Sequence, residues 1–337
     1  MSILGHIATT LFAAKAVLAV FWLLALGLSL ILAFAVGVFR PRAAVGPERL
    51  SPTWPALRLV LALAMGFCSW VLASSLYVTW KGAANHPPGL KHPFSPGDWA
   101  YLSTVPPAAF FLTLCFADWA IGGAELLNRL GISIRRLGIG IAKGILAAFI
   151  ILPPTYLLSA VADQFYNSVK FQHPREHELL KVMQEPQRPA MHWILILAAV
   201  LVAPVFEEFL FRGHLQSLLR RGLVLGSLRW RAAQLRKEQL RHGFPLDTQQ
   251  GLPAAPVIAP NSFADIPIEP AVWQTWTAIV LTSVLFASVH PMWMWPPIFF
   301  LSLGLGYSYE RTGNLWTAMT VHCLFNSIST IVFLTLT

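Results

Sequence analysis

The chain has 337 residues, of which 56% are hydrophobic and only 12% charged, and its mean hydropathy is +0.60. These values exclude an ordinary soluble domain, in which about a quarter of the residues are charged. The net charge of +9 does not indicate nucleic-acid binding, because the basic residues gather in alternate connections between apolar segments.

Apolar segments of helix length recur along the chain, at 16–39, 57–80, 99–122, 138–162, 191–213, 272–290, 296–310 and 315–336. A helix needs about 20 residues to cross the hydrocarbon core of a bilayer. The sequence therefore predicts an all-α, polytopic membrane bundle of about eight transmembrane helices. The seventh segment is short, and its ends are the least definite.

The distribution of charge predicts how these helices are oriented. Basic residues gather around the first, third and fifth connections: Arg40, Arg42, Arg49 and Arg58; Arg129, Arg135 and Arg136; and Arg220, Arg221, Arg229, Arg231, Arg236, Lys237 and Arg241. The second connection has only Lys81 and Lys91, and the fourth balances basic with acidic residues. The positive-inside rule then places the N-terminus outside a plasma or inner membrane, with the basic connections facing cytoplasmic anionic lipid headgroups.

The fifth apolar segment contains two adjacent acids, Glu207 and Glu208, followed by Arg212. On a helix, Glu208 and Arg212 are four residues apart and can pair, whereas Glu207 is rotated by about 100° from Glu208. Ionisable groups at membrane depth are costly unless they are paired or line a wet cavity, so they mark a functional site by default. We expect Glu208 and Arg212 to support the structure and Glu207 to act as a general base.

A long connection follows the acidic pair. It begins with a basic helical stretch from Leu215 to Arg241 and becomes rich in Pro and Ala between Pro245 and Pro270. The basic part has the composition of a helix that lies on the cytoplasmic headgroup surface. The Pro-rich part is expected to be a flexible link rather than a domain.

Two further polar patterns lie in the last apolar segments. Phe286 and His290 share one helical face just before Pro291, and His322 and Asn326 are four residues apart. His322 and Asn326 can both donate hydrogen bonds to one point, as an oxyanion hole demands. Each pattern alone also fits a structural role, since His and Asn commonly make hydrogen bonds between membrane helices. Together with the acidic pair they favour a hydrolytic site.

The order and types of these residues resemble those of the CPBP intramembrane proteases, which include the type II CAAX prenyl endopeptidases and bacteriocin-processing or immunity proteins. The matching stretches are APVFEEFLFRG (203–213), FASVHP (286–291) and GLGYSYERTGNLWTAMTVHCLFN (304–326). The resemblance covers about residues 190–337. It implies N-terminal transmembrane helices over 1–165 and a catalytic core over 166–337, with a basic and Pro-rich cytoplasmic insertion at about 214–271.

The resemblance implies a glutamate-dependent intramembrane endopeptidase that uses no cofactor and no metal. By this analogy Glu207 and His290 position and activate a water, and His322 with Asn326 stabilises the oxyanion. Three further residues would support the site: Glu208, Arg212 and Phe286. The implied substrates are peptides or proteins in the lipid bilayer, lipidated ones among them, which reach a site that opens toward the cytoplasm. The oligomeric state is left open.

Two alternatives belong to other classes. One is a non-catalytic membrane scaffold or immunity-type protein that keeps the fold and binds a partner. The other is a zinc-dependent peptidase, because Glu207, His290 and His322 would make a legitimate catalytic zinc site. The stretch His173–His177 also spells a zinc-peptidase motif, H-x-x-E-H, but its proline and its polar surroundings argue against a ligating helix.

Three further expectations concern position. His214 is expected to be a solvated boundary histidine, and Asp118 to lie near a helix end, where a charged side chain reaches water. Counting at 1.5 Å per residue places Glu207 ~24 Å along its segment, and His290 ~27 Å along the next one from the opposite side. The two residues would then lie at opposite faces of the membrane, unless a helix starts later, tilts or projects beyond the bilayer.

Overall fold

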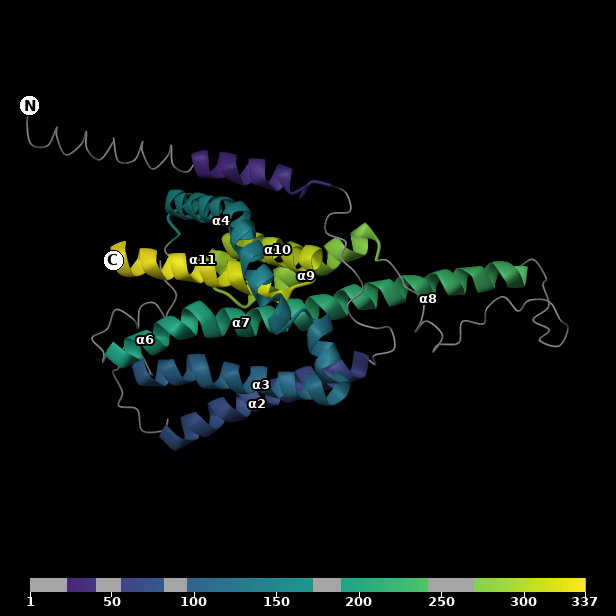
Figure 1. Cartoon of the computed structure of the whole chain (residues 1–337), viewed down its shortest axis with the longest axis horizontal. Helices are drawn as coiled ribbons and strands as arrows, with labels where there is room; N and C mark the ends of the chain where they lie inside the picture. Colours follow the sequence, from purple (N-terminus) through teal and green to yellow (C-terminus); the bar gives the residue numbers. More distant parts are fainter. Residues whose placement is uncertain (1–22, 41–55, 82–95, 172–188, 242–269, 337) are drawn as a thin grey trace, which may run out of the picture.

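Figure 1 shows a computed structural model of the chain, which describes residues 23–40, 56–81, 96–171, 189–241 and 270–336. Every regular element in these ranges is a helix. Five helices are long and apolar enough to cross a membrane: Val60–Lys81, Gly97–Ala120, Leu127–Ser168, Ala190–Glu238 and Leu315–Thr335. Two shorter apolar helices are Leu23–Ala35 and Val272–Ser288. The protein is an all-α integral membrane bundle, as the sequence predicts.

The helices follow one another in the order that the apolar segments predict. After the helix Leu23–Ala35 they are α2 (Ala56–Lys81), α3 (Pro96–Arg129), η2 (Ile134–Arg136), α4 (Leu137–Ser168), α6 (Pro189–Leu197), η3 (Ala198–Val202), α7 (Ala203–Glu208), η4 (Phe209–Gln216), α8 (Ser217–Arg241), α9 (Val272–Ser288), η6 (Met292–Met294), α10 (Trp295–Thr312) and α11 (Leu315–Leu336). The elements η2 and η6 are 3₁₀ turns, whereas η3 and η4 are π-helical. Each predicted segment thus falls on a helix, although the start of the first lies outside the described residues.

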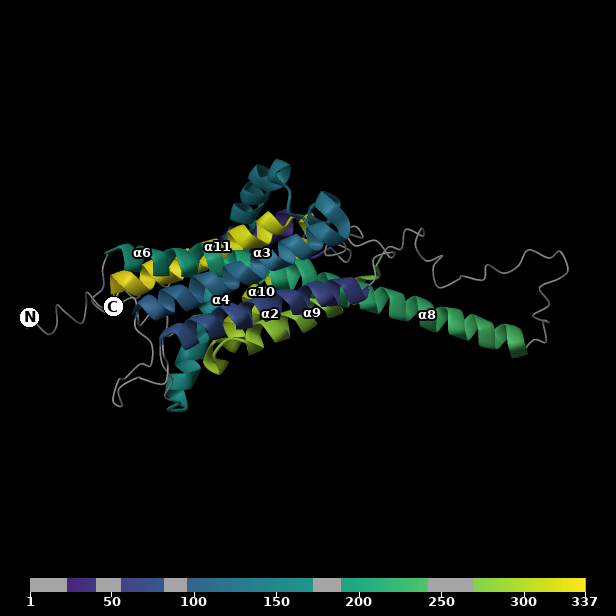
Figure 2. The same ribbon diagram turned by 90° about the horizontal axis from the view of Figure 1, so that it is seen from below.

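The fifth helix is much longer than its apolar segment. The elements from α6 to α8 form one continuous rod, and Figures 1 and 2 both show α8 extending past the end of the bundle. The expectation that the basic stretch lies on the headgroup surface is therefore wrong, because α8 continues the axis of the spanning helix. Residues 242–269, which contain the Pro-rich part, lie outside the described residues.

The start of α9 removes the conflict in depth between Glu207 and His290. The side chain of Gln274, near the start of α9, donates a hydrogen bond of 2.8 Å to the hydroxyl of Ser227 on α8. Ser227 lies 20 residues beyond Glu207, about 30 Å along a helix. From this point α9 runs back along α8 toward α7, so its end reaches the level of the acidic pair.

The helix α4 packs closely against α11 because two glycines face it. A Cβ atom at Gly144 would lie 2.5 Å from Cβ of Thr320, and one at Gly140 would lie 2.6 Å from Cβ of Trp316. Small residues four apart are a common means of close approach between membrane helices. This contact fixes α11, which carries His322, against the middle of the bundle.

Aromatic packing holds α7 against the helices α2 and α3. The ring of Phe206 contacts Phe110 at 5.0 Å and Trp70 at 5.7 Å between ring centroids, in edge-to-face arrangements. Such aromatic pairs add to the stabilisation that burial alone gives. The hairpin of α2 and α3 therefore anchors the helix one residue before the acidic pair, and the N-terminal helices share one core with the C-terminal ones.

Candidate active site

The acidic pair lies on a short α-helical segment between two π-helical ones. The segment α7 ends at Glu208, with η3 before it and η4 directly after it. π-helical turns are rare and are frequent at functional sites. All three elements belong to the continuous rod, so the acidic residues sit on a rigid helix rather than on a loop.

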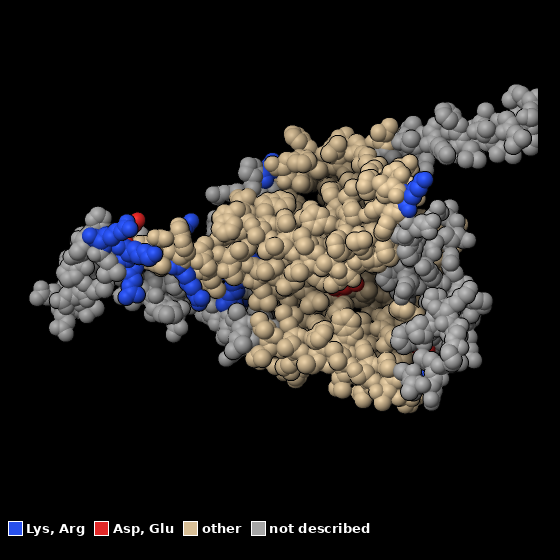
Figure 3. Space-filling model, turned by 180° about the vertical axis from the view of Figure 1, so that it is seen from behind, with Lys and Arg blue, Asp and Glu red and all other residues tan. Residues whose placement is uncertain are grey.

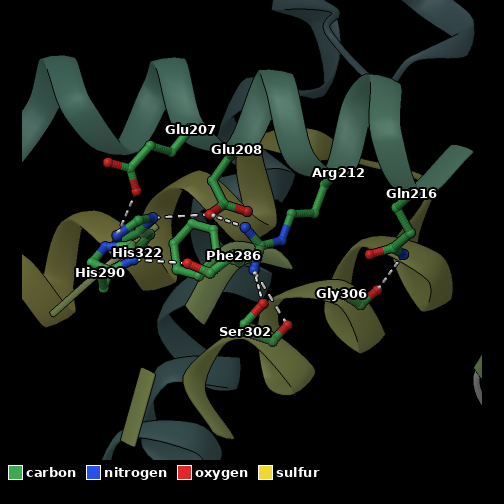
Figure 4. A network of polar contacts seen from close by, with 9 residues as sticks. All are labelled: Glu207, Glu208, Arg212, Gln216, Phe286, His290, Ser302, Gly306 and His322. Carbon is green, nitrogen blue, oxygen red and sulfur yellow. Dashed lines mark hydrogen bonds and ion pairs between the residues drawn. The ribbon is translucent and has the colours of Figure 1, made fainter. Parts of the chain in front are cut away.

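The imidazole of His322 lies between the two glutamates (Figure 4). Its Nδ1 is 2.9 Å from Oε1 of Glu208, and its Nε2 is 3.8 Å from Oε2 of Glu207. The first distance is a hydrogen bond, whereas the second is too long for one. The structure thus brings a histidine of α11 next to two carboxylates of α7, of which Glu208 is 114 residues away in sequence.

Glu208 and Arg212 form the ion pair that their spacing predicts. The guanidinium Nη1 donates to Oε1 of Glu208 at 3.0 Å, and both side chains are completely buried. On its other side the guanidinium donates from Nη2 to the hydroxyl of Ser302 at 2.7 Å. It also lies 4.4 Å from the ring centroid of Phe286, within the range of a cation–π contact. Arg212 is therefore fixed from three directions.

Phe286 and His290 lie next to the glutamate cluster, but His290 is not on the helix as predicted. The helix α9 ends at Ser288, and the Nδ1 of His290 donates to the carbonyl of Phe286 at 2.8 Å. This bond satisfies one of the carbonyls that a helix end leaves without an intrahelical partner. The ring of Phe286 contacts His290 at 4.9 Å and His322 at 5.8 Å, so both imidazoles flank one aromatic ring.

Asn326 faces a different turn of the rod from the one that His322 faces. Its Nδ2 donates to the carbonyl of Ala199 at 2.8 Å, and Ala199 belongs to the π-helical segment η3. One amide N–H of Asn326 is thus used by the backbone, and the convergence of His322 and Asn326 on one point stays a prediction. The amide nitrogen carries a second N–H, which is also a donor.

Glu207 differs from Glu208 in its exposure. The side chain of Glu207 is 23% exposed, whereas that of Glu208 is completely buried. Figure 3 shows one acidic residue, in red, beside a hollow in the otherwise uncharged middle of that face of the molecule. A base must be within reach of both water and substrate, and of the two acids only Glu207 has accessible oxygen surface for this.

A comparison with known families finds one match, in the C-terminal part of the chain. The chain matches the family described as type II CAAX prenyl endopeptidase Rce1-like over residues 189–236 and 261–328. The C-terminal part of the chain is thus similar to this family of membrane proteases, as the CPBP resemblance of its motifs predicts. No match was found among curated proteins or among solved structures.

The match supports a hydrolase of the protease type, with a peptide substrate and a lipid environment. The matched residues include every candidate site residue, from the acidic pair to Asn326. The unmatched interval, 237–260, lies inside the insertion that the sequence predicts at about 214–271. Residues 1–188 and 329–337 also lie outside the match.

A buried histidine close to the CPBP motif was missed by the sequence analysis. His214 is 1% exposed, and its Nε2 lies 2.8 Å from Oδ2 of Asp118 on α3. Its Nδ1 donates to the carbonyl of Phe209, at 3.0 Å. The expectations of a solvated His214 and of an Asp118 near water are both wrong. The signal was present in the sequence, because a buried acid in a membrane helix requires a partner.

The zinc alternative has no compact ligand set in the part of the chain that the structure describes. Within those ranges no three His, Cys, Asp or Glu side chains are grouped so that they could hold a metal ion. The motif His173–His177 lies outside the described residues. Metal analysis of the purified protein therefore decides between a zinc site and a metal-free one.

Proposed function

We propose that this protein is an intramembrane endopeptidase of the glutamic type, in which Glu207 activates the attacking water. The observation that supports this most directly is the position of His322 between an exposed carboxylate and a buried one. Paired structural ions in a membrane bundle would both be buried and hydrogen-bonded. Glu207 is instead partly exposed and 3.8 Å from an imidazole nitrogen.

The separation of Glu207 from His322 suits a water between them. One water can bond to two atoms that are 3.8 Å apart, because each bond needs about 2.8 Å and the two bonds meet at an angle. In the first step the Glu207 carboxylate takes a proton from this water. The oxygen that remains forms a bond to the carbonyl carbon of the scissile peptide, whose oxygen becomes an oxyanion.

The hydrogen bonds of His290 fix which of its nitrogens accepts. A carbonyl oxygen can only accept, so the Nδ1 that faces the carbonyl of Phe286 must carry the proton. In the neutral ring Nε2 then has a free lone pair. His290 thus acts as an acceptor that orients the water for Glu207, in agreement with the role that the family resemblance implies.

The oxyanion receives its hydrogen bonds from α11. The Nδ1 of His322 is committed to Glu208, so Nε2 can donate only in the imidazolium form of the ring. The second amide N–H of Asn326 provides another donor. When the intermediate collapses, Glu207 returns its proton to the leaving nitrogen and the carbon–nitrogen bond breaks.

The substrate class follows from the surroundings of the site. The middle of the face in Figure 3 has few charged residues and suits contact with lipid, so we infer that the substrate segment arrives from the bilayer, either as a membrane segment or as a peptide that carries a lipid. By the positive-inside rule, the basic residues of α8 support a cytoplasmic location for its end of the bundle and an outside location for the N-terminus. The site then opens toward the cytoplasmic side.

The test compares the wild type with Glu207→Gln in proteoliposomes that contain a library of membrane-anchored peptides, half of them prenylated. Mass spectrometry of the products is expected to find cleavage in the wild type that is absent in the variant. Preference for the prenylated half identifies lipidated substrates. If neither half is cleaved in a Glu207-dependent way, the peptidase proposal fails and the non-catalytic scaffold is favoured.

A further inference from the structure

A row of polar side chains continues from the site along the rod. Glu208, Arg212, Gln216 and Arg220 follow one another at intervals of four, and each is no more than 1% exposed. Residues four apart share one face of a helix. A membrane helix normally buries apolar or small side chains, so a row of four polar groups requires matching partners.

The helix α10 provides a matching row at the same interval: Ser302, Gly306 and Glu310. The first pair joins Arg212 to Ser302, whose hydroxyl and carbonyl accept from Nη2 at 2.7 and 3.3 Å (Figure 4). The two residues are 90 apart in the sequence. Ser302 is 1% exposed, so no solvent competes for this bond.

The next two pairs repeat this separation. Gln216 donates from Nε2 to the carbonyl of Gly306 at 3.2 Å and to Oε1 of Glu310 at 2.9 Å. Arg220 lies 2.6 Å from Oε2 of Glu310, and these residues are again 90 apart. The two helices therefore run parallel with one fixed register, since a shift by one residue would break all three pairs.

A glycine permits the close approach of the two rows. A Cβ atom at Gly306 would lie 2.7 Å from the side-chain oxygen of Gln216. Real Cβ atoms essentially never come this close, so a side chain here would push the helices apart or displace the amide. The distance between the two helices is thus set at Gly306, which also accepts the hydrogen bond from Gln216.

We propose that this paired row positions the site, and that Ser302 and Gln216 are positioning residues for the hydrolysis. The inference rests on the proposed function. Only two residues connect Ser302 to the imidazole of His322, namely Arg212 and Glu208. Nη1 of Arg212 and Nδ1 of His322 contact the same oxygen, Oε1 of Glu208. Ser302 holds the guanidinium at its far end, so its loss lets the guanidinium turn and moves the oxygen that orients His322.

The experiment measures kcat and KM of Ser302→Ala and Ser302→Thr on a peptide that the wild type cleaves, in liposomes. Ser302→Ala removes one hydrogen bond to a charged group, so kcat is expected to fall about 10-fold while KM stays within twofold. Ser302→Thr, which keeps a hydroxyl, is expected to restore most of kcat. Gln216→Met, one turn farther away, is expected to lower kcat by a smaller factor.

The matched control is Ser308→Ala, since Ser308 is a buried serine on the same helix outside the paired row. It is expected to leave kcat unchanged. Equal effects of Ser302→Ala and Ser308→Ala, or no rescue by Ser302→Thr, would overturn the positioning role.

A second measurement separates this inference from the peptidase proposal. Thermal unfolding of Ser302→Ala, Glu208→Gln and the double variant forms a double-mutant cycle that needs no activity. Positioning through Arg212 predicts that the two losses of stability are not additive. Additive losses would contradict the path through Arg212, whereas a wild type without Glu207-dependent cleavage would contradict the function alone.

Discussion

The imidazole of His322 and the carboxylate of Glu208 share a hydrogen bond of 2.9 Å, made to the oxygen that Arg212 also contacts at 3.0 Å. One oxygen atom thus joins the ion pair within the fifth helix to the histidine of α11. The other imidazole nitrogen is directed toward Glu207 at 3.8 Å. In the proposed function, the buried acid orients the histidine and the partly exposed acid acts as the base.

The first prediction concerns Arg212→Lys. A lysine carries one compact ammonium instead of a planar fork, so it cannot reach Glu208 and Ser302 together. We expect kcat to fall about 10- to 100-fold, the equivalent of a lost hydrogen bond to a charged group. The control is Arg229→Lys on the exposed part of α8, which should leave kcat unchanged. If Arg212→Lys kept the full kcat, the two simultaneous contacts of the guanidinium with Glu208 and Ser302 would not be needed for the hydrolysis.

The second prediction concerns the glycines between α4 and α11. Gly144→Ala places a Cβ atom 2.5 Å from Thr320 and 2.9 Å from the carbonyl of Thr317, so the two helices must separate. Overpacking of this kind costs about 1–3 kcal/mol. The thermal midpoint is expected to fall and, because α11 carries His322, kcat is expected to fall as well.

Gly138→Ala is the control for this substitution, because a Cβ atom at Gly138 meets nothing within 4 Å. It should leave both the thermal midpoint and kcat unchanged or raise the midpoint slightly, since alanine favours the helix. Equal behaviour of the two variants in a thermal unfolding assay would show that the contact between α4 and α11 is not close.

The sequence predicts those parts of the site that depend on a single helix. The pairing of Glu208 with Arg212 follows from a spacing of four, and the structure confirms it at 3.0 Å. The contact of His322 with Glu208 joins residues 114 apart in sequence. The periodicity within one helix contains no information on how α7 and α11 face each other, so the sequence could not predict this contact.

The depth of His290 relative to Glu207 could not be settled from the sequence for a related reason. A count of 1.5 Å per residue takes each helix to begin at a membrane surface, whereas α9 begins beside Ser227 on the projecting α8. Hydropathy cannot distinguish a helix that starts at the bilayer surface from one that starts beyond it. The polar residues of α8 continue the fifth helix past its apolar segment, and α9 starts beside this continuation. The buried partner of Asp118 was missed because His214 was judged by its place at the end of an apolar segment.

The third prediction concerns the buried pair Asp118 and His214. Removal of one partner leaves an uncompensated polar group, so Asp118→Leu and His214→Leu should each lower the free energy of unfolding by about 3–5 kcal/mol. Replacement of both partners removes this penalty, so the double variant should lose clearly less than the sum. Chemical unfolding in detergent measures all three values. Strict additivity would mean that the two side chains do not act as a pair.

The fourth prediction concerns metal. The candidate residues act through hydrogen bonds to carboxylates and carbonyls, so peptide cleavage should survive strong chelators. Elemental analysis of the purified protein should find no stoichiometric zinc. About one zinc per chain that is lost in His290→Ala would instead support a metallopeptidase, in which two histidines and a carboxylate are a familiar ligand set.

The last prediction separates the roles of the two adjacent acids. Glu208→Ala leaves the buried guanidinium of Arg212 without its charge partner, so stability should fall by about 3–5 kcal/mol and activity with it. Glu207→Gln keeps the shape of a partly exposed side chain and leaves no buried charge without a partner, so stability should not fall. Thermal unfolding should therefore distinguish the two variants before any rate is measured.

The most direct test of the central claim is the rate of peptide cleavage by Glu207→Gln, compared with the wild type at equal amounts of folded protein in the same liposomes. Loss of the general base is expected to lower kcat by about 10²- to 10⁴-fold while the thermal midpoint stays unchanged. Cleavage by Glu207→Gln within tenfold of the wild-type rate would contradict the account, because Glu207 would then not be the base that activates the water.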